Sequence, residues 1–200
     1  MKNYLRDYGF LLGMAGIVIL LDQWTKALVR NMLPVGGTWM PWEWLRPYAR
    51  IVHWYNSGAA FGLFQNGAIV FTVLAIVVAG LILYYFPRTS PQDWSLRLAM
   101  GLQLGGALGN LIDRLTRDGQ VTDFISLGAF PVFNVADASI TVGVIVLVLG
   151  AWLKERGSKG AGEQVTTNAL RGSKGAEEQG GRGAEEQGSR GAEEQGSRGE

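Results

Sequence analysis

The distribution of apolar residues along the chain predicts helices that cross a membrane. Residues 67–86, GAIVFTVLAIVVAGLILYYF, form a run of twenty residues without a charge, which is about the length that an α-helix needs to span the hydrocarbon layer. Three weaker runs occupy residues 10–29, 98–115 and 138–153, and each is shorter or carries charges at one end. We therefore expect an all-α membrane protein built as a bundle of four transmembrane helices.

The first apolar run is open to a second interpretation as a signal peptide, because Lys2 and Arg6 precede it. Signal peptides end in a cleavage site of small residues. No such site follows this run, whereas Asp22 and Lys26 continue its helical spacing. We therefore treat it as a span of the mature protein.

The connection between the first two runs, residues 30–66, is rich in aromatic residues. It holds four of the seven Trp of the chain and alternating segments such as RIVHWYN at residues 50–56. Alternation with aromatic residues is typical of β-strands, and Trp and Tyr rings prefer the membrane–water interface. We expect this insert to form a small extracytoplasmic β-rich loop domain over the bundle.

The composition changes sharply after residue 153. The segment 154–200 is dominated by Gly, Glu, Gln, Ser and Arg and repeats AEEQGSRG with a period of eight from Ala176. Such a composition offers too little apolar surface to form a packed core. We expect a transmembrane domain at residues 1–153, with the β-rich insert at about 30–66, and a disordered low-complexity tail at 154–200.

Charge and Cys content narrow the possible chemistry. The chain of 200 residues has a formal net charge of +1, no Cys and one His. Disulfides and the usual Cys/His zinc or iron–sulfur sites are therefore excluded, although carboxylates can still hold a hard cation. The near-neutral charge gives no electrostatic footprint for nucleic acid. Lys and Arg are slightly more frequent near the N-terminus, residues 87–97 and the start of the tail, which favours cytoplasmic termini.

Polar residues gather at one face of the predicted bundle. Antiparallel neighbours bring the ends of the first and third spans to the same side as the starts of the second and fourth. The positions concerned are Asp22, Lys26, Asn56, residues 110–123, Asn134 and Asp137. Ionisable residues at membrane depth are costly and usually face a cavity or a partner. The gathering therefore predicts a functional site.

Some of these positions have a structural interpretation. Asp22 and Lys26 are four residues apart, which lets the two charges neutralise each other along one helix face, so we expect a structural polar pair. Gly101, Gly105 and Gly109 form a stripe that allows close helix packing. A neighbouring stripe consists of Gly106, Asn110, Asp113 and Arg114. It fits a structural hydrogen-bond network and a substrate-binding surface equally well.

Asp123 and Asp137 have no cation at helical spacing, and residues 124–153 contain no other charge than Asp137. An Asp before an apolar helix can serve as its N-cap, which explains part of the presence of Asp137. Two carboxylates at one mouth of the bundle cannot both ionise cheaply, so they share a proton. Such a pair can activate a water and protonate a leaving amine, as in aspartic proteases.

Five segments together resemble the lipoprotein signal peptidase family, also called signal peptidase II. They are DQWTK at 22–26, NSGAAFG at 56–62, GGALGNLIDR at 105–114, VTDFI at 121–125 and FNVADASI at 133–140. The likeness covers about residues 8–153. It implies a bacterial inner-membrane aspartic endopeptidase that removes signal peptides from diacylglyceryl-modified prolipoproteins, on the N-terminal side of the lipidated Cys.

The resemblance also implies roles for single residues. Asp123 in VTDFI and Asp137 in FNVAD become the catalytic pair, at the extracytoplasmic face. The residues implied to line the site or orient the substrate are Asn56, Asn110, Arg114 and Asn134. Arg114 would be a donor to the scissile carbonyl or its oxyanion. We expect a monomer surrounded by membrane lipids, with no metal, no other cofactor and no nucleic acid.

Two other functions fit part of the pattern. His53 and Ser57, or Ser57 with Lys26, would make a serine-type pair, although the strand-like segment around His53 separates the two side chains. A small channel or transporter subunit would use its intramembrane acids as a proton relay. That reading gives no reason for VTDFI and FNVAD to occur together.

Overall fold

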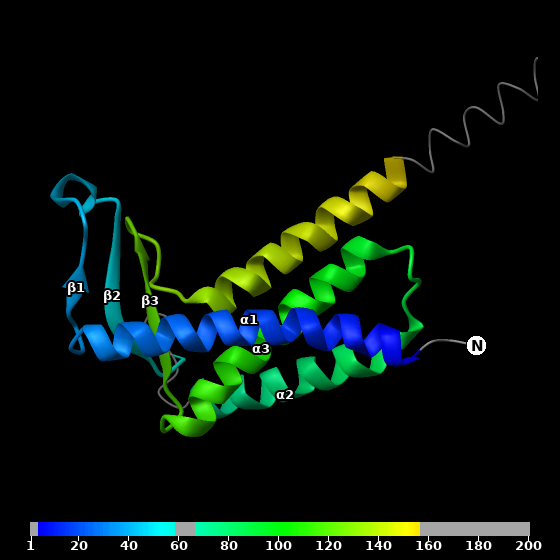
Figure 1. The fold of residues 1–200 in the computed structure, drawn as a ribbon, viewed down its shortest axis with the longest axis horizontal. Helices are drawn as coiled ribbons and strands as arrows, with labels where there is room; N and C mark the ends of the chain where they lie inside the picture. The colour runs from blue at the N-terminus through cyan, green and yellow to red at the C-terminus, as the bar shows by residue number, and fades with distance from the viewer. Residues whose placement is uncertain (1–3, 59–66, 157–200) are drawn as a thin grey trace, which may run out of the picture. The chain divides into compact units, whose positions relative to one another are not determined.

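The computed structural model describes residues 4–58 and 67–156, and residues 1–3, 59–66 and 157–200 lie outside the description. The long helices are α1 (Tyr4–Met32), α2 (Gly67–Tyr85), α3 (Trp94–Thr116) and a C-terminal helix, Val135–Arg156 (Figure 1). The strands are β1 (Thr38–Trp39), β2 (Ala49–Asn56) and β3 (Val121–Leu127), with short 3-10 turns η1 (Glu43–Leu45) and η3 (Phe86–Arg88). The predicted tail lies outside the described residues, apart from 154–156, which continue the C-terminal helix.

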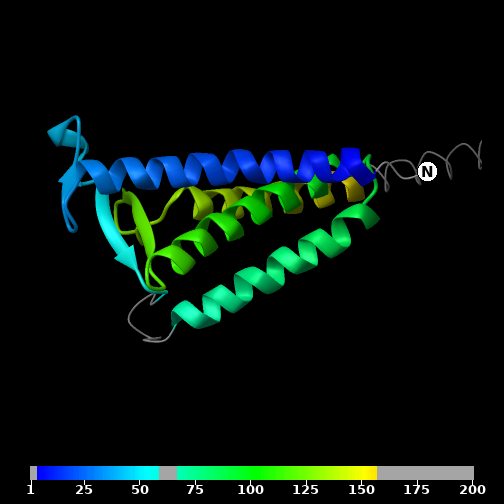
Figure 2. The ribbon, with the colours of Figure 1, turned by 60° about the horizontal axis from the view of Figure 1, so that its bottom comes forward.

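Each predicted apolar run is confirmed as part of a helix. Within the described chain, three segments are long and apolar enough to cross a membrane: Tyr8–Met32, Gly67–Arg88 and Val135–Arg156. The helix α3 lies between α1 and α2 (Figure 2). It is less apolar because it carries buried polar residues, such as Asn110 and Asp113, that contact Lys26 of α1. The protein is therefore mostly helical, with three helices that are apolar enough to span a membrane.

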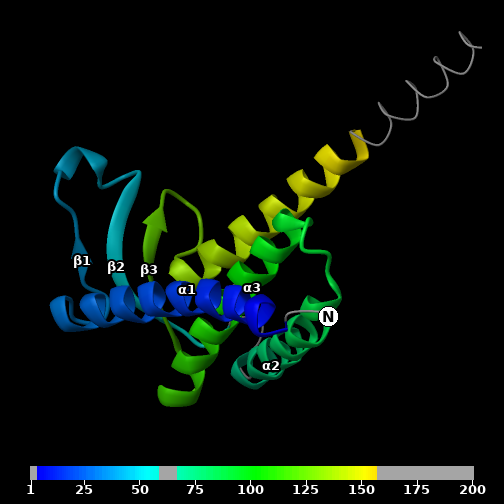
Figure 3. The same cartoon turned by 45° about the vertical axis from the view of Figure 1, so that its right-hand side comes forward.

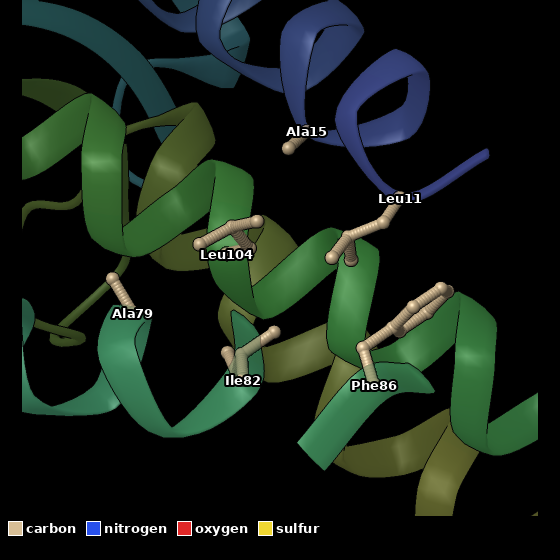
Figure 4. Packing of buried hydrophobic residues seen from close by; sticks show 6 residues of the cluster. All are labelled: Leu11, Ala15, Ala79, Ile82, Phe86 and Leu104. Atoms are coloured by element: carbon tan, nitrogen blue, oxygen red, sulfur yellow. The ribbon is translucent and has the colours of Figure 1, made fainter. Parts of the chain in front are cut away.

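The helices pack through a small apolar core and leave large apolar side chains on their outer surfaces. The core cluster consists of Leu11, Ala15, Ala79, Ile82, Phe86 and Leu104, which come from α1, α2, η3 and α3 (Figure 4). On α2, Ile69 is 72 % exposed and Val70 is 62 % exposed. Apolar surface of this extent is normally covered by a partner or by lipid.

The glycine stripe of α3 is confirmed as a packing surface against α1. A Cβ on Gly105 would lie 2.6 Å from Cβ of Val18 and 2.9 Å from the carbonyl oxygen of Ala15. The neighbouring Gly106 faces the C-terminal helix instead, because its Cβ would lie 2.5 Å from the carbonyl oxygen of Ala136. These two glycines therefore let α3 approach both partner helices closely.

The sheet lies beside the C-terminal part of α1 (Figures 1 and 3), and it is antiparallel in the order β1-β2-β3. The insert at residues 30–66 does form two strands, but β3 comes from the connection between α3 and the C-terminal helix, which was expected to be a loop. Phe133 extends this pairing through a bridge to Ile125, with backbone N–O distances of 2.8 and 3.1 Å. The bridge brings residue 134 beside β3.

Candidate active site

Asp123 projects from the middle of β3 and is 1 % exposed. Its backbone pairs with Trp54 of β2, so Asn56 is its diagonal neighbour across the two strands. The Asn56 amide donates to Oδ2 of Asp123 at 2.8 Å, and the Asn134 amide donates to Oδ1 at 2.7 Å. Both oxygens of this carboxyl group therefore have a neutral donor.

Asp137 lies in the first turn of the C-terminal helix, and the expectation that it is the N-cap is wrong. The helix begins at Val135, and Asn134 is the N-cap, because its carbonyl accepts from the N–H of Ala138 at 3.1 Å. The side chain of Asn134 accepts from the N–H of Asp137 at 3.0 Å, and that of Asp137 accepts from the N–H of Asn134 at 3.2 Å. This reciprocal arrangement has the geometry of a capping box.

Three amides around the two carboxyl groups have a fixed orientation. Oδ1 of Asn56 accepts from the N–H of Gly58 at 2.8 Å, and Oδ1 of Asn110 accepts from Nζ of Lys26 at 3.0 Å. Because the amide oxygens are occupied, the NH2 groups of Asn56, Asn110 and Asn134 turn toward the carboxyl groups. Asn110 in this way donates to Oδ1 of Asp137 at 2.7 Å.

Asp22 and Lys26 form the predicted polar pair, with an N–O distance of 2.8 Å and both side chains fully buried. The pair also holds other elements in place. The other oxygen of Asp22 accepts from the backbone N–H of Ala136 at 2.9 Å, at the start of the C-terminal helix. Lys26 reaches Asn110, so α1 orients the amide that contacts Asp137.

Asp113 and Gln23 belong to this network, although no separate role for either followed from the sequence. Asp113 is fully buried, lies 3.3 Å from Nζ of Lys26, and accepts from the backbone N–H of Thr122 at 3.0 Å. Gln23 donates to Asp113 at 3.2 Å and to the carbonyl of Gly109 at 3.0 Å. The position of Asp113 in the polar stripe of α3 indicated that it could belong to the site, whereas no sequence pattern pointed to Gln23.

Burial, followed by the nearby negative charge of Asp137, raises the pKa of Asp123 from 3.8 to about 6. The amides of Asn56 and Asn134 and the positive charge of Lys26 act in the opposite direction. Burial is the largest of these effects, so the carboxyl group of Asp123 retains a proton at a pH where an ordinary Asp has lost it.

A groove of about 460 Å³ opens beside this network, between α2, α3 and the C-terminal helix. Its polar end contains Asn56, Asn110, Arg114 and Asp137, while Asp123 lies behind Asn56 and does not line it. Most of its remaining lining is apolar, for example Leu74 of α2 and Ile140 of the C-terminal helix. The groove can therefore receive an apolar molecule with a polar group at one end.

Arg114 is the cation at the polar end of the groove. The centre of its guanidinium lies 5.4 Å from the ring centroid of Phe71, and its buried Nε has no hydrogen-bond partner among the described residues. A guanidinium in this position has donors left for an oxyanion in the groove.

The alternative serine-type pair is not assembled. Nδ1 of His53 lies 2.8 Å from the carbonyl oxygen of Leu33, on the buried side of β2, whereas Ser57 is exposed. Lys26 is engaged by Asp22, Asp113 and Asn110. In the described part of the chain no group of three acidic or His side chains is arranged to hold a metal ion.

Comparison with known proteins identifies the family. Residues 14–153 match the family described as Signal peptidase (SPase) II. The chain is 39 % identical over 151 residues to the lipoprotein signal peptidase of Anoxybacillus flavithermus, covering 74 % of this chain and 88 % of that protein. It is 42 % identical over 140 residues to that of Moorella thermoacetica, covering 67 % and 87 %.

A solved structure of a bacterial membrane enzyme, determined by the in meso method at 2.3 Å resolution, has the same fold. It matches with a TM-score of 0.65 and 31 % sequence identity, over 74 % of this chain and 90 % of that one. A second such structure, at 1.9 Å resolution, matches with a TM-score of 0.64 and 30 % identity, over 72 % and 92 %. The chain belongs to the signal peptidase II family.

Proposed function

We propose that this protein is an aspartic endopeptidase that removes signal peptides from diacylglyceryl-modified prolipoproteins, cutting on the N-terminal side of the lipidated Cys. The observation that carries the proposal is the position of Asp123 and Asp137 on either side of Asn134, which donates to both carboxyl groups, at 2.7 and 3.2 Å. The family and the names of the relatives support the substrate class.

The two aspartates have different surroundings, which supports a division of roles. Asp137 lines the groove, where a substrate and a water would lie, and accepts from the Asn110 amide and the Asn134 backbone. Burial keeps a proton on Asp123 up to a pH of about 6. Asp137 is therefore the base that faces the attacking water, and Asp123 holds the proton of the pair.

The reaction then runs in two steps. Asp137 takes a proton from the water as its oxygen attacks the scissile carbonyl carbon, and the Arg114 guanidinium stabilises the oxyanion that forms. When the intermediate collapses, the C–N bond breaks and the proton of Asp123 passes to the leaving amine nitrogen, which reaches Asp123 by displacing the Asn56 amide from Oδ2. The pair ends with the single proton taken from water, and its proton count is unchanged over the cycle.

The groove explains why a lipid-modified substrate would suit this site. Its polar end is at Asp137, and its apolar lining continues along α2 and the C-terminal helix, whose outer surfaces carry exposed apolar side chains. A substrate held in the bilayer by two acyl chains can approach such a groove by lateral diffusion. The enzyme then needs no soluble encounter with its substrate.

We infer a location in the bacterial inner membrane, with α3 as a fourth span between the three apolar helices. An even number of spans puts both termini on one side, which the slight excess of Lys and Arg assigns to the cytoplasm. The sheet and the aspartates then lie at the extracytoplasmic face. We propose that residues 1–153 form a monomeric peptidase domain and that the tail, 154–200, is dispensable for cleavage.

The test is a gel-shift cleavage assay in detergent with a diacylglyceryl-modified prolipoprotein and its unmodified form. Cleavage of the lipidated form by the wild type, but not by Asp137→Asn, is the expected result. Deletion of residues 160–200 and addition of EDTA should leave the rate unchanged. A folded wild type that cleaves neither form would refute the proposal, and inhibition by EDTA would point to a cation held by carboxylates.

A further inference from the structure

The groove contains a polar residue that the proposed reaction does not use. Gln103 of α3 lines it seven residues before Asn110, which places it about 10 Å farther from the aspartates along the helix. At the same depth on the C-terminal helix, Val144 lies seven residues after Asp137. Gln103 is therefore an isolated amide in the apolar part of the groove, away from Asp137.

The packing of Gln103 directs its stem across the C-terminal helix. A Cβ on Gly143 would lie 3.1 Å from Cγ of Gln103, so the absence of a side chain at residue 143 leaves room for that stem. The terminal amide forms no hydrogen bond with any described residue. A side chain of this kind at membrane depth is costly unless its donors find an acceptor.

The substrate offers the acceptors that this position lacks. A diacylglyceryl Cys carries two ester carbonyls a short distance beyond its thioether, and the signal peptide carries backbone carbonyls on the other side of the cleaved bond. Both are carbonyl oxygens, which accept from an amide NH2 group. An apolar groove with one such donor can recognise a lipid ester without holding a charge at membrane depth.

We propose that the Gln103 amide donates a hydrogen bond to a carbonyl oxygen of the bound substrate, below the aspartates, with the ester of the diacylglyceryl group as the main source of that carbonyl. This inference rests on the proposed function, because it assumes that the groove holds the lipidated substrate. Gln103 is then a binding residue for the lipid part of the substrate and takes no part in proton transfer.

The experiment compares two synthetic lipobox peptides. One carries the natural S-diacylglyceryl Cys, and the other carries the same chains through ether links, which lack the ester carbonyls. The variants are Gln103→Leu and Gln103→Met, which remove the amide and keep an apolar stem of similar size, and Leu102→Met is the matched control on the adjacent position of α3. For each enzyme, kcat and KM are measured with both peptides.

The expected result is a rise in KM of about three- to tenfold for both Gln103 variants with the ester peptide, with kcat unchanged. The wild type should lose a similar factor on the ether peptide, and the variants should lose nothing more there. Equal losses on both peptides would assign the carbonyl to the signal peptide backbone. Unchanged KM in both variants would overturn the inference.

A binding measurement distinguishes a failure of the Gln103 contact from a failure of the proposed peptidase function. In the Asp123→Asn background, where no cleavage is expected, the Kd of each peptide is measured with and without the additional Gln103→Leu substitution. A weaker Kd for the ester peptide alone supports the contact even if the wild type cleaves nothing. Equal Kd values for Gln and Leu overturn the contact even if the wild type cleaves normally.

Discussion

Asn134 and Asp137 cap the C-terminal helix reciprocally: the N–H of Asp137 donates to the Asn134 side chain at 3.0 Å, and the N–H of Asn134 donates to the Asp137 side chain at 3.2 Å. One carboxyl group therefore both closes a helix terminus and faces the groove. Because the cap fixes the side-chain rotamer, it also fixes the direction in which the free lone pairs of Asp137 point.

Substitution of either aspartate by Asn should abolish cleavage and leave the protein folded. An Asn at position 137 still accepts from the N–H of Asn134, so we expect a change of about 1 kcal/mol or less in the free energy of unfolding. Neither amide can exchange a proton with water or amine at neutral pH. The assay is cleavage of a lipidated prolipoprotein, with Tm measured alongside.

The matched control is Asp118→Asn, which changes an exposed Asp in the turn between α3 and β3. Asp118 has a positive φ of 50°, a conformation that Asn also adopts readily. This variant should cleave at the wild-type rate. Retained cleavage by Asp123→Asn or Asp137→Asn would instead show that the two carboxyl groups do not act as a pair.

Replacement of Asn134 can separate its capping role from its contacts with the aspartates. Ser is as good an N-cap as Asn, so Asn134→Ser should keep the helix terminus. A Ser hydroxyl has one proton, however, and cannot donate to Asp123 and Asn110 together, as the Asn134 amide does at 2.7 and 3.1 Å. We expect kcat to fall at least about tenfold with little change in Tm. Asn134→Ala should lose about a further 1 kcal/mol of stability, and equal kcat values for wild type and Asn134→Ser would contradict the positioning role.

The pH dependence of cleavage should follow the proton on Asp123. Burial raises the pKa of Asp123 to about 6, so the pair holds its proton below that pH and loses it above. The value of kcat/KM, which reports the free enzyme, should therefore fall as pH rises through about 6. The same shift makes the free energy of unfolding decrease with rising pH between about 3.8 and 6, because the native state binds the proton more tightly.

The substitution Asn56→Leu tests whether Asp123 is the group that sets the falling limb of kcat/KM. The Asn56 amide donates to Oδ2 of Asp123 at 2.8 Å and lowers its pKa, against the larger effect of burial. Its removal should move the falling limb of kcat/KM to higher pH. A limb at the same pH in the variant and the wild type would mean that another group titrates, whereas Asp118→Asn should leave the limb in place.

Much of the helical fold and the position of the candidate site follow from local sequence signals. Runs of apolar residues define the helices because nearly every residue of a span contributes to the same signal. The Asp22–Lys26 pair was predictable because its spacing is set by the helix itself. Because successive spans run in opposite directions, the polar ends of the four spans were predicted to lie at one face of the bundle.

The remaining features depend on contacts between distant segments. The strand β3 was missed because it pairs with β2, about seventy residues earlier, and its residues are buried on both faces, so polar and apolar positions do not alternate. The hydrogen bond from the Ala136 backbone to Asp22 joins residues 114 positions apart. Local spacing carries no information about such pairs, and the same holds for the contact of Lys26 with Asn110.

Loss of the buried ion pair should cost far more than loss of an exposed one. Lys26→Met leaves Asp22 and Asp113 buried without the ammonium that lies 2.8 and 3.3 Å away, and breaking such a pair costs about 3–5 kcal/mol. The control is Glu43→Gln, which removes an exposed pair with Arg46 at 2.9 Å and should cost at most about 1 kcal/mol. Chemical denaturation in detergent measures both, and similar losses would contradict a supporting role for Lys26.

Gly106→Ala tests whether close packing of α3 against the C-terminal helix holds Asp137 in place. The new Cβ would lie 2.5 Å from the carbonyl oxygen of Ala136 and 2.6 Å from Cγ1 of Ile140. A backbone oxygen cannot move alone, so the start of the C-terminal helix must shift, and Asp137 is the next residue. We expect a loss of about 1–3 kcal/mol of stability and a fall in kcat of about tenfold or more.

The control, Gly80→Ala in α2, has no atom within 4 Å of its new Cβ and should gain about 0.5–1 kcal/mol through helix propensity. Wild-type kcat in Gly106→Ala would show that the aspartates keep their geometry without this contact.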